Sequence, residues 1–119
     1  MNKGGGRPMH IQNPLGKIDI SKRIVSKIIL DSVQVTVGTL IASKRNSGRR
    51  VSWFGSRPDP VDLQDSPQGL DIHVSVLIRH RLNMPEVCRR LQANIREKVE
   101  AFTGLPVGRV NVTIEGVFA

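Results

Sequence analysis

The residues able to coordinate a soft metal ion are three histidines and one cysteine, and their spacing argues against a metal site. His10, His73, His80 and Cys88 never pair at ligand spacing on one predicted element, so we expect no zinc site. Cys88 falls on the apolar side of a predicted helix, where a thiol packs as a small apolar group rather than acting as a nucleophile. Because it is the sole cysteine, it cannot form a disulfide within the chain.

No pattern typical of a catalytic site follows from the remaining polar residues. The sequence contains neither a G-x-S-x-G nucleophile motif nor a phosphate-binding loop with its lysine. Asp59, Asp62 and Asp65 recur in one stretch, but the stretch lacks the glycine and terminal glutamate of a calcium loop. We therefore predict that the protein is not an enzyme, with no catalytic residues, no metal and no cofactor.

Positively charged side chains form the best candidate for a binding surface. Residues 44–50, KRNSGRR, place four positive charges in seven positions around an Asn-Ser-Gly turn. This turn predicts the tip of a hairpin over residues 38–54, in which arginines would pair with phosphates and Trp53 or Phe54 would stack on a base. The candidate residues for binding an anion or nucleic acid are Lys44, Arg45, Arg49, Arg50, Trp53, Arg79 and Arg81. In the alternative interpretation, Trp53 belongs to the core and the loop is merely solvated.

The positive charge of the chain is concentrated in its first half. The formal net charge is +8; residues 1–58 hold 11 Lys/Arg and 2 Asp/Glu, whereas residues 59–119 hold 7 Lys/Arg and 8 Asp/Glu. Such a distribution suits an anionic partner, namely RNA, DNA, an anionic membrane surface or an acidic protein, although it can also serve solubility alone. The apolar runs are too short to span a bilayer, so we expect no transmembrane segment.

In its first half, the chain predicts an arm, a helix, a strand and a long loop. Residues 1–16 contain Gly4–Gly6 and two prolines, and predict a flexible basic arm ahead of a single domain over 17–119. A first helix is predicted over 17–33, with Ser21 as its N-cap, and a strand near 37–43. Residues 55–69 combine three prolines with three aspartates and predict a mobile loop.

In its second half, the chain predicts a strand, a helix and a strand. Residues 70–80 alternate between apolar and polar, and residues 109–118 alternate with Val110, Val112, Ile114 and Phe118 on one face. Between them, a helix over 84–103 is capped by Asn83 and ended by Gly104. Its predicted apolar stripe consists of Met84, Cys88, Leu91, Ile95, Val99 and Phe102. The expected fold is a two-layer α+β domain, in which two helices cover one face of a small, mainly antiparallel sheet of about four strands.

These two strands and the helix between them resemble the bacterial alkaline shock protein 23 family. The similarity covers the run D-I-H-V-S-V-L-I-R-H and the helix and strand that follow it, and is weaker at Ile18–Ser21 and Val37–Gly38. The matching positions are Gln92, Val99, Thr103, Gly104, Leu105, Val110, Asn111, Val112, Gly116 and Val117. Unlike typical members, which are acidic or near neutral, this chain is strongly basic.

The resemblance implies a non-enzymatic interaction or scaffold protein linked to cell-envelope stress. It implies a cytoplasmic homo-oligomer that is recruited to the inner face of the membrane by a membrane-associated protein, and it carries over no catalytic residues. The alternative, which follows from charge rather than resemblance, is an RNA- or DNA-binding protein, ribosome-associated or not, that uses the 44–50 loop and the N-terminal arm.

Overall fold

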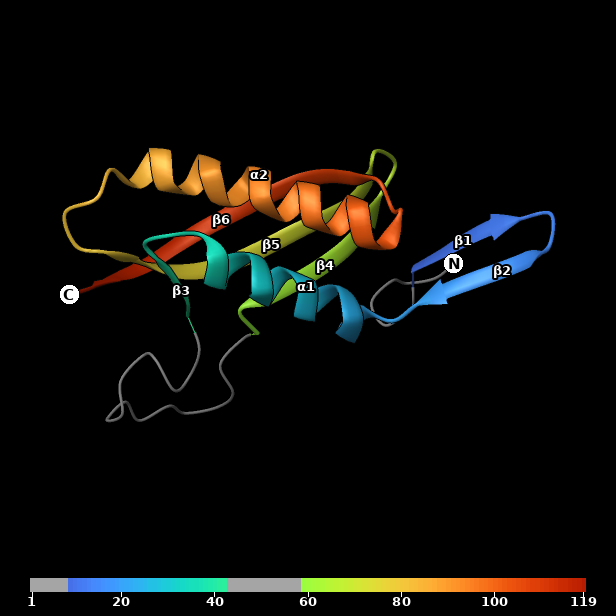
Figure 1. Cartoon of the computed structure of the whole chain (residues 1–119), viewed down its shortest axis with the longest axis horizontal. Helices are drawn as coiled ribbons and strands as arrows, with labels where there is room; N and C mark the ends of the chain where they lie inside the picture. The colour runs from blue at the N-terminus through green and yellow to red at the C-terminus, as the bar shows by residue number, and fades with distance from the viewer. Residues whose placement is uncertain (1–8, 43–58) are drawn as a thin grey trace.

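The computed structural model is an α+β fold in which two helices lie on one face of a four-stranded sheet (Figure 1). It describes residues 9–42 and 59–119. The elements are β1 (Met9–Asn13), β2 (Gly16–Ile20), α1 (Lys22–Val35), β3 (Thr39–Ile41), β4 (Val61–Ser66), β5 (Gly69–Arg79), α2 (Met84–Thr103) and β6 (Val107–Phe118). The predicted fold class, with its two layers and mainly antiparallel sheet, is confirmed.

Strand β5 is the centre of the sheet, because every other strand of the sheet pairs with it. On one edge β6 runs parallel to β5, joined to it by α2 as a βαβ crossover. On the other edge β3 and β4 both run antiparallel to β5. The residues of β5 alternate as its sequence predicts: Leu70, Ile72, Val74, Val76 and Ile78 are buried under the helices.

Strands β3 and β4 behave as two halves of one strand. Ile41 lies opposite Val76 of β5, and Val61 lies opposite Val74, so one ladder position remains between the halves, opposite Ser75. The Ala42 N–H donates to the Ser75 carbonyl (3.0 Å), and the Ser75 N–H donates to the Pro60 carbonyl (2.9 Å). Ala42 and Pro60 thus share one position, and the chain between them leaves and re-enters the sheet at a single point.

Both helices are capped as their sequences predict. The Ile24 N–H donates to the Ser21 hydroxyl (3.3 Å), and the Glu86 N–H donates to the Asn83 side-chain oxygen (3.0 Å). Gly104 ends α2 with a φ of 74°, a left-handed conformation that glycine adopts without steric cost. The core lies between the helices and the sheet, and the helix residues that are fully buried in it include Val25, Ile29, Leu91, Ile95 and Val99.

The structure corrects the predicted arm at the N-terminal end. Residues 9–20 form the β1–β2 hairpin, so the flexible arm over 1–16 is wrong for residues 9–16, and α1 begins at Lys22 rather than at residue 17. Pro14 and Leu15 form the turn between the two strands, in which the Leu15 N–H donates to the Asn13 side-chain oxygen (2.8 Å). Residues 1–8 lie outside the described residues.

The predicted mobile loop over 55–69 is also wrong for residues 61–69. Residues 61–66 form β4, and a tight turn leads directly into β5. The prediction was wrong because Pro60 and Pro67 flank the strand and do not interrupt it. The aspartates Asp62 and Asp65 are compatible with a strand here, since they are exposed on the edge of the sheet. Of the predicted hairpin over 38–54, residues 43–54 lie outside the described residues.

Two predicted apolar faces are shifted in the structure. On α2 the buried residues are Val87, Leu91, Ile95, Val99 and Thr103, whereas Phe102 is 73% exposed and Met84 is 37% exposed. On β6 a bulge interrupts the predicted alternation, since Ile114 pairs with Val76 and Gly116 with Leu77, leaving Glu115 as the additional residue. The bulge moves Phe118 to the open face of the sheet, opposite Arg79, instead of the helix-covered face.

Candidate functional site

Five of the seven predicted anion-binding residues lie in a segment that the structure does not describe. These are Lys44, Arg45, Arg49, Arg50 and Trp53. The segments 1–8 and 43–58 together hold seven Lys/Arg and no Asp/Glu, so the described residues carry 11 Lys/Arg and 10 Asp/Glu, a net charge of +1. The positive charge of the protein therefore belongs to two segments joined to a nearly neutral fold.

The two described candidates, Arg79 and Arg81, lie where β5 leads toward α2. The Arg79 guanidinium lies over the Phe118 ring, 5.2 Å from its centroid, on the open face of the sheet. Arg81 has a φ of 75°, which is unusual for a residue with a side chain and marks a tight turn. The stacking of Arg79 on Phe118 gives this end of the sheet a small surface that is both basic and aromatic.

A polar hollow of about 260 Å³ lies on the open face of the sheet. It is lined by side chains from three adjacent strands: Asp62, Gln64, Asp71, His73 and Asn111. The Asp71 carboxylate accepts hydrogen bonds from the Arg109 N–H (3.1 Å) and the Ser66 hydroxyl (3.3 Å), and the His73 Nε2 lies 2.9 Å from the Thr113 hydroxyl. Among residues 9–42 and 59–119, no group of three or more His, Cys, Asp or Glu side chains is arranged to hold a metal ion.

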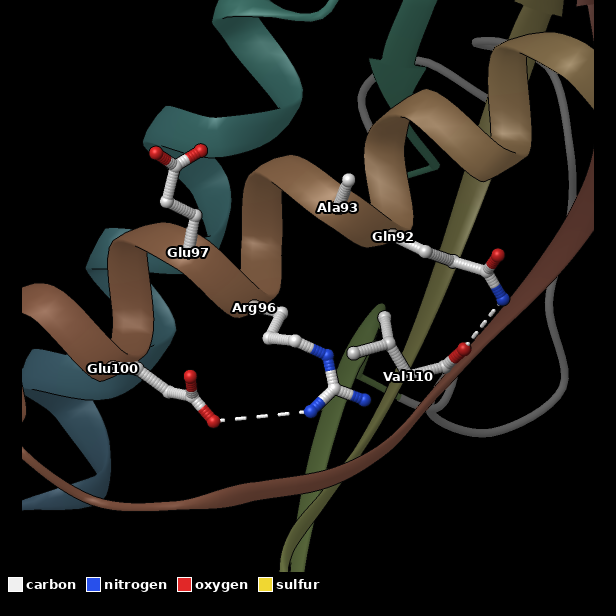
Figure 2. A pocket seen from close by; sticks show the side chains of 6 residues that line it. All are labelled: Gln92, Ala93, Arg96, Glu97, Glu100 and Val110. Carbon is white, nitrogen blue, oxygen red and sulfur yellow. Dashed lines mark hydrogen bonds and ion pairs between the residues drawn. The ribbon is translucent and has the colours of Figure 1, made fainter.

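A second hollow, of about 570 Å³, follows the junction of α2 with the outer edge of β6. Figure 2 shows Gln92, Arg96 and Glu100 directed from successive turns of α2 toward β6, whereas Glu97 points away from the strand. Gln92 donates to the Val110 carbonyl (2.8 Å), and Arg96 donates to the carbonyls of Val107 (2.7 Å) and Gly108 (3.0 Å). The Glu100 carboxylate accepts from the Val107 N–H (3.0 Å) and lies 3.8 Å from Arg96.

These contacts close the first part of an exposed strand edge. A free edge offers backbone donors and acceptors to any other strand, and side chains that occupy those groups prevent such pairing. Gln92, Arg96 and Glu100 perform this role between Val107 and Val110, and no α2 side chain reaches the edge beyond Val110 among the described hydrogen bonds. This role was not predicted from the sequence, although the four-residue spacing of Gln92, Arg96 and Glu100 marks one stripe of the helix.

A third groove, of about 660 Å³, lies between α1 and β3. Its walls combine the basic side chains of Arg23 and Lys27 with the apolar side chains of Leu30, Leu40 and Ile41. It lies beside Ala42, where the chain enters the segment outside the described residues. The groove is therefore amphipathic and basic at one end.

The single cysteine does not have the surroundings of a reactive thiol. Cys88 lies on α2, partly buried and packed against the core. Burial raises the pKa of its thiol above the usual value, which lowers the thiolate fraction near neutral pH. This agrees with its predicted place among the apolar residues of the helix.

Comparison with known families identifies the chain. A family model for the alkaline shock protein 23 family, described as having a cell envelope-related function, matches residues 10–119. Searches of curated proteins and of solved structures returned no match. Among the described residues, neither helix is long and apolar enough to cross a lipid bilayer. Because the family model spans both helices and all six strands apart from Met9, the chain belongs to the alkaline shock protein 23 family, whose function is related to the cell envelope.

Proposed function

We propose that this protein is a non-enzymatic interaction module of the cell-envelope stress response, which self-associates and binds a membrane-associated protein on the cytoplasmic side of the membrane. The observation that supports this most directly is the family match, which extends over residues 10–119. A small two-layer domain with a nearly neutral body, a partly open strand edge and exposed apolar side chains offers surfaces for protein contacts.

Light scattering coupled to size-exclusion chromatography tests self-association. The purified full chain, measured over a hundredfold concentration range, should show a mass that rises from one copy to two or more. A strictly monomeric mass over the whole range would refute self-association. For the membrane partner, cross-linking in cells should give one adduct in the membrane fraction, and the purified adduct partner must bind the purified chain in vitro.

Binding of RNA or DNA is the second candidate function. One observation favours it: the segment 43–58 carries five Lys/Arg and no Asp/Glu, and the described residues on either side of it, Ala42 and Pro60, both hydrogen-bond to Ser75 in the middle of β5. Such a segment can present its charges together, which is the requirement for neutralising several phosphates at once.

Titration of RNA at two salt concentrations separates the two candidates. If the basic segment binds phosphates, affinity should fall steeply with salt, and the double change Arg49→Ala, Arg50→Ala should weaken binding and reduce the salt slope by about 2. The matched control is Arg89→Ala, Arg90→Ala, because this adjacent pair is exposed on α2 within the nearly neutral part of the chain. Equal losses for both pairs, or no salt dependence, would remove nucleic-acid binding.

A further inference from the structure

The outer edge of β6 is closed in its first part and open in its second. On its inner edge β6 pairs with β5 along its length, and no strand among residues 9–42 and 59–119 pairs with its outer edge. The α2 side chains that close this edge end at Val110. None of the described strands therefore covers the outer edge of β6 between residues 111 and 118, and an edge that no strand covers can pair with another strand.

The direction of the backbone groups follows from the contact with Gln92. Since the Val110 carbonyl accepts from Gln92, it points away from β5. Backbone direction alternates along a strand, so Val112 and Ile114 also direct their N–H and carbonyl groups outward. The same residues place their side chains on the helix-covered face, where both are partly buried.

When residues 111–118 pair antiparallel with the same residues of a second copy, opposed side chains lie on the same face of the sheet. Antiparallel pairing of residues 111–118 with the same residues of a second copy places Val112 opposite Val117. It also places Asn111 opposite Phe118, and Thr113 opposite Gly116. The bulge at Glu115 makes this possible, because it shifts the alternation so that Val117, like Val112, lies on the helix-covered face.

The exposure of Val117 also favours a second copy of this chain. Val117 is 50% exposed although its Cα is paired with that of the buried Ile78, so it lacks cover on the outer side. The only charged residue in the segment is Glu115, which the pairing places opposite Ile114 of the second copy and next to the two-fold axis. In each copy, the part of β6 that α2 closes, from Val107 to Val110, lies outside the paired residues.

We propose that two copies of this protein pair through residues 111–118 of β6, antiparallel and around a two-fold axis, to form one continuous sheet with all four helices on the same face. This inference rests on the self-association proposed above and deepens it by assigning the surface. A two-fold contact is self-complementary and closes on itself, as is usual for homodimers.

Disulfide cross-linking tests both the surface and the register. In a Cys88→Ala background, Val112→Cys protein is mixed with Val117→Cys protein and oxidised. Opposed Cα atoms in an antiparallel ladder are about 4.5–5.5 Å apart, which lies within the range that a disulfide spans. The mixture should give on the order of tenfold more covalent dimer than the controls, because pairing raises the effective concentration of the two thiols.

Two controls define the background of the experiment. Val110→Cys mixed with Val117→Cys tests the closed part of the same edge, and Leu15→Cys mixed with Val117→Cys reports random collision, since Leu15 is 98% exposed at the tip of the hairpin. Circular dichroism spectra and melting curves verify that each variant is folded.

The possible outcomes separate this inference from the proposed function. A dimer by light scattering, with selective cross-linking of residues 112 and 117, supports both. A dimer by light scattering with cross-linking no greater than in the controls overturns the β6 surface and leaves self-association standing. A wild-type chain that is monomeric at every concentration, with no selective cross-link, overturns both.

Discussion

Removing residues 43–60 and joining Ala42 to Val61 should leave the fold intact. Ala42 donates to the Ser75 carbonyl and Pro60 accepts from the Ser75 N–H, so the two residues share one ladder position. In the shortened chain, the Ala42 carbonyl takes the place of the Pro60 carbonyl. Ile41 then remains opposite Val76 and Val61 opposite Val74, so every side chain keeps its face.

The expected gain in stability comes from the entropy of closing the loop. By the logarithmic dependence on length, closing a segment of this size costs about 2–3 kcal/mol, which is the upper limit of the gain in the free energy of unfolding. Each kcal/mol corresponds to about 4 °C in Tm for a chain of this size. The deletion also removes five Lys/Arg and one Asp, so the net charge falls from +8 to +4.

Urea and thermal denaturation, followed by circular dichroism, measure the effect. The matched control removes residue 42 as well and joins Ile41 to Val61, which slips β3 by one residue and directs the buried Thr39 and the partly buried Ile41 to the wrong face. This control should lose about 2–3 kcal/mol. Loss of cooperative unfolding in the first deletion, or equal stability of the two deletions, would refute the description of β3 and β4 as one strand.

Four further results are expected. Replacing the fully buried Leu91 or Ile95 by Ala should lower the free energy of unfolding by about 2–5 kcal/mol in urea titrations, and near-normal stability of both variants would contradict their central position in the core. Gly104→Ala should cost about 1–2 kcal/mol because φ is 74° at that residue, whereas Ala101→Gly, on an exposed turn of the same helix, should cost about 1 kcal/mol by helix propensity alone. The double change Gln92→Ala, Arg96→Ala should open the first part of the β6 edge and raise light scattering by aggregates on storage, while Arg89→Ala, Arg90→Ala should not. Because burial raises the pKa of the Cys88 thiol, the thiol stays protonated in the folded chain at pH values where it ionises in the unfolded chain. Alkylation of Cys88 should therefore reach half its maximal rate at a higher pH in the folded protein than in the urea-unfolded protein. The free energy of unfolding should also fall as the pH rises through that range.

The elements with uninterrupted periodicity were predicted well from the sequence. The alternation from Leu70 to Ile78 and the caps at Ser21, Asn83 and Gly104 are local signals, since each depends on neighbouring residues alone. The family resemblance, which depends on the same stretch, was confirmed over a longer part of the chain. These signals were sufficient for the α+β class and the two-layer arrangement.

What the sequence did not predict depends on contacts between distant residues. Strand β4 is short and flanked by prolines, and it exists because β5 offers it a partner. The side on which Phe118 lies depends on a bulge whose consequence can be seen only in the register with β5. The edge of β6 is closed by hydrogen bonds from α2, which precedes it in the sequence. In the sequence alone, the polar stripe of Gln92, Arg96 and Glu100 cannot be distinguished from a solvated helix surface.

The central place of β5 determines when the sheet can form during synthesis. β3 and β4 pair only with β5, so no strand pair of the main sheet can form before the ribosome has reached β5, and β3 finds its partners only when residues 76–78 have been made. At a synthesis rate of about 5–20 residues per second, the basic stretch before residue 59 emerges roughly 1–4 s ahead of its structural support. During that interval a nascent chain presents a cationic segment next to the rRNA-rich surface of the ribosome. Codon changes that slow translation between residues 59 and 79 should therefore lower the yield of folded protein more than equal changes after residue 84.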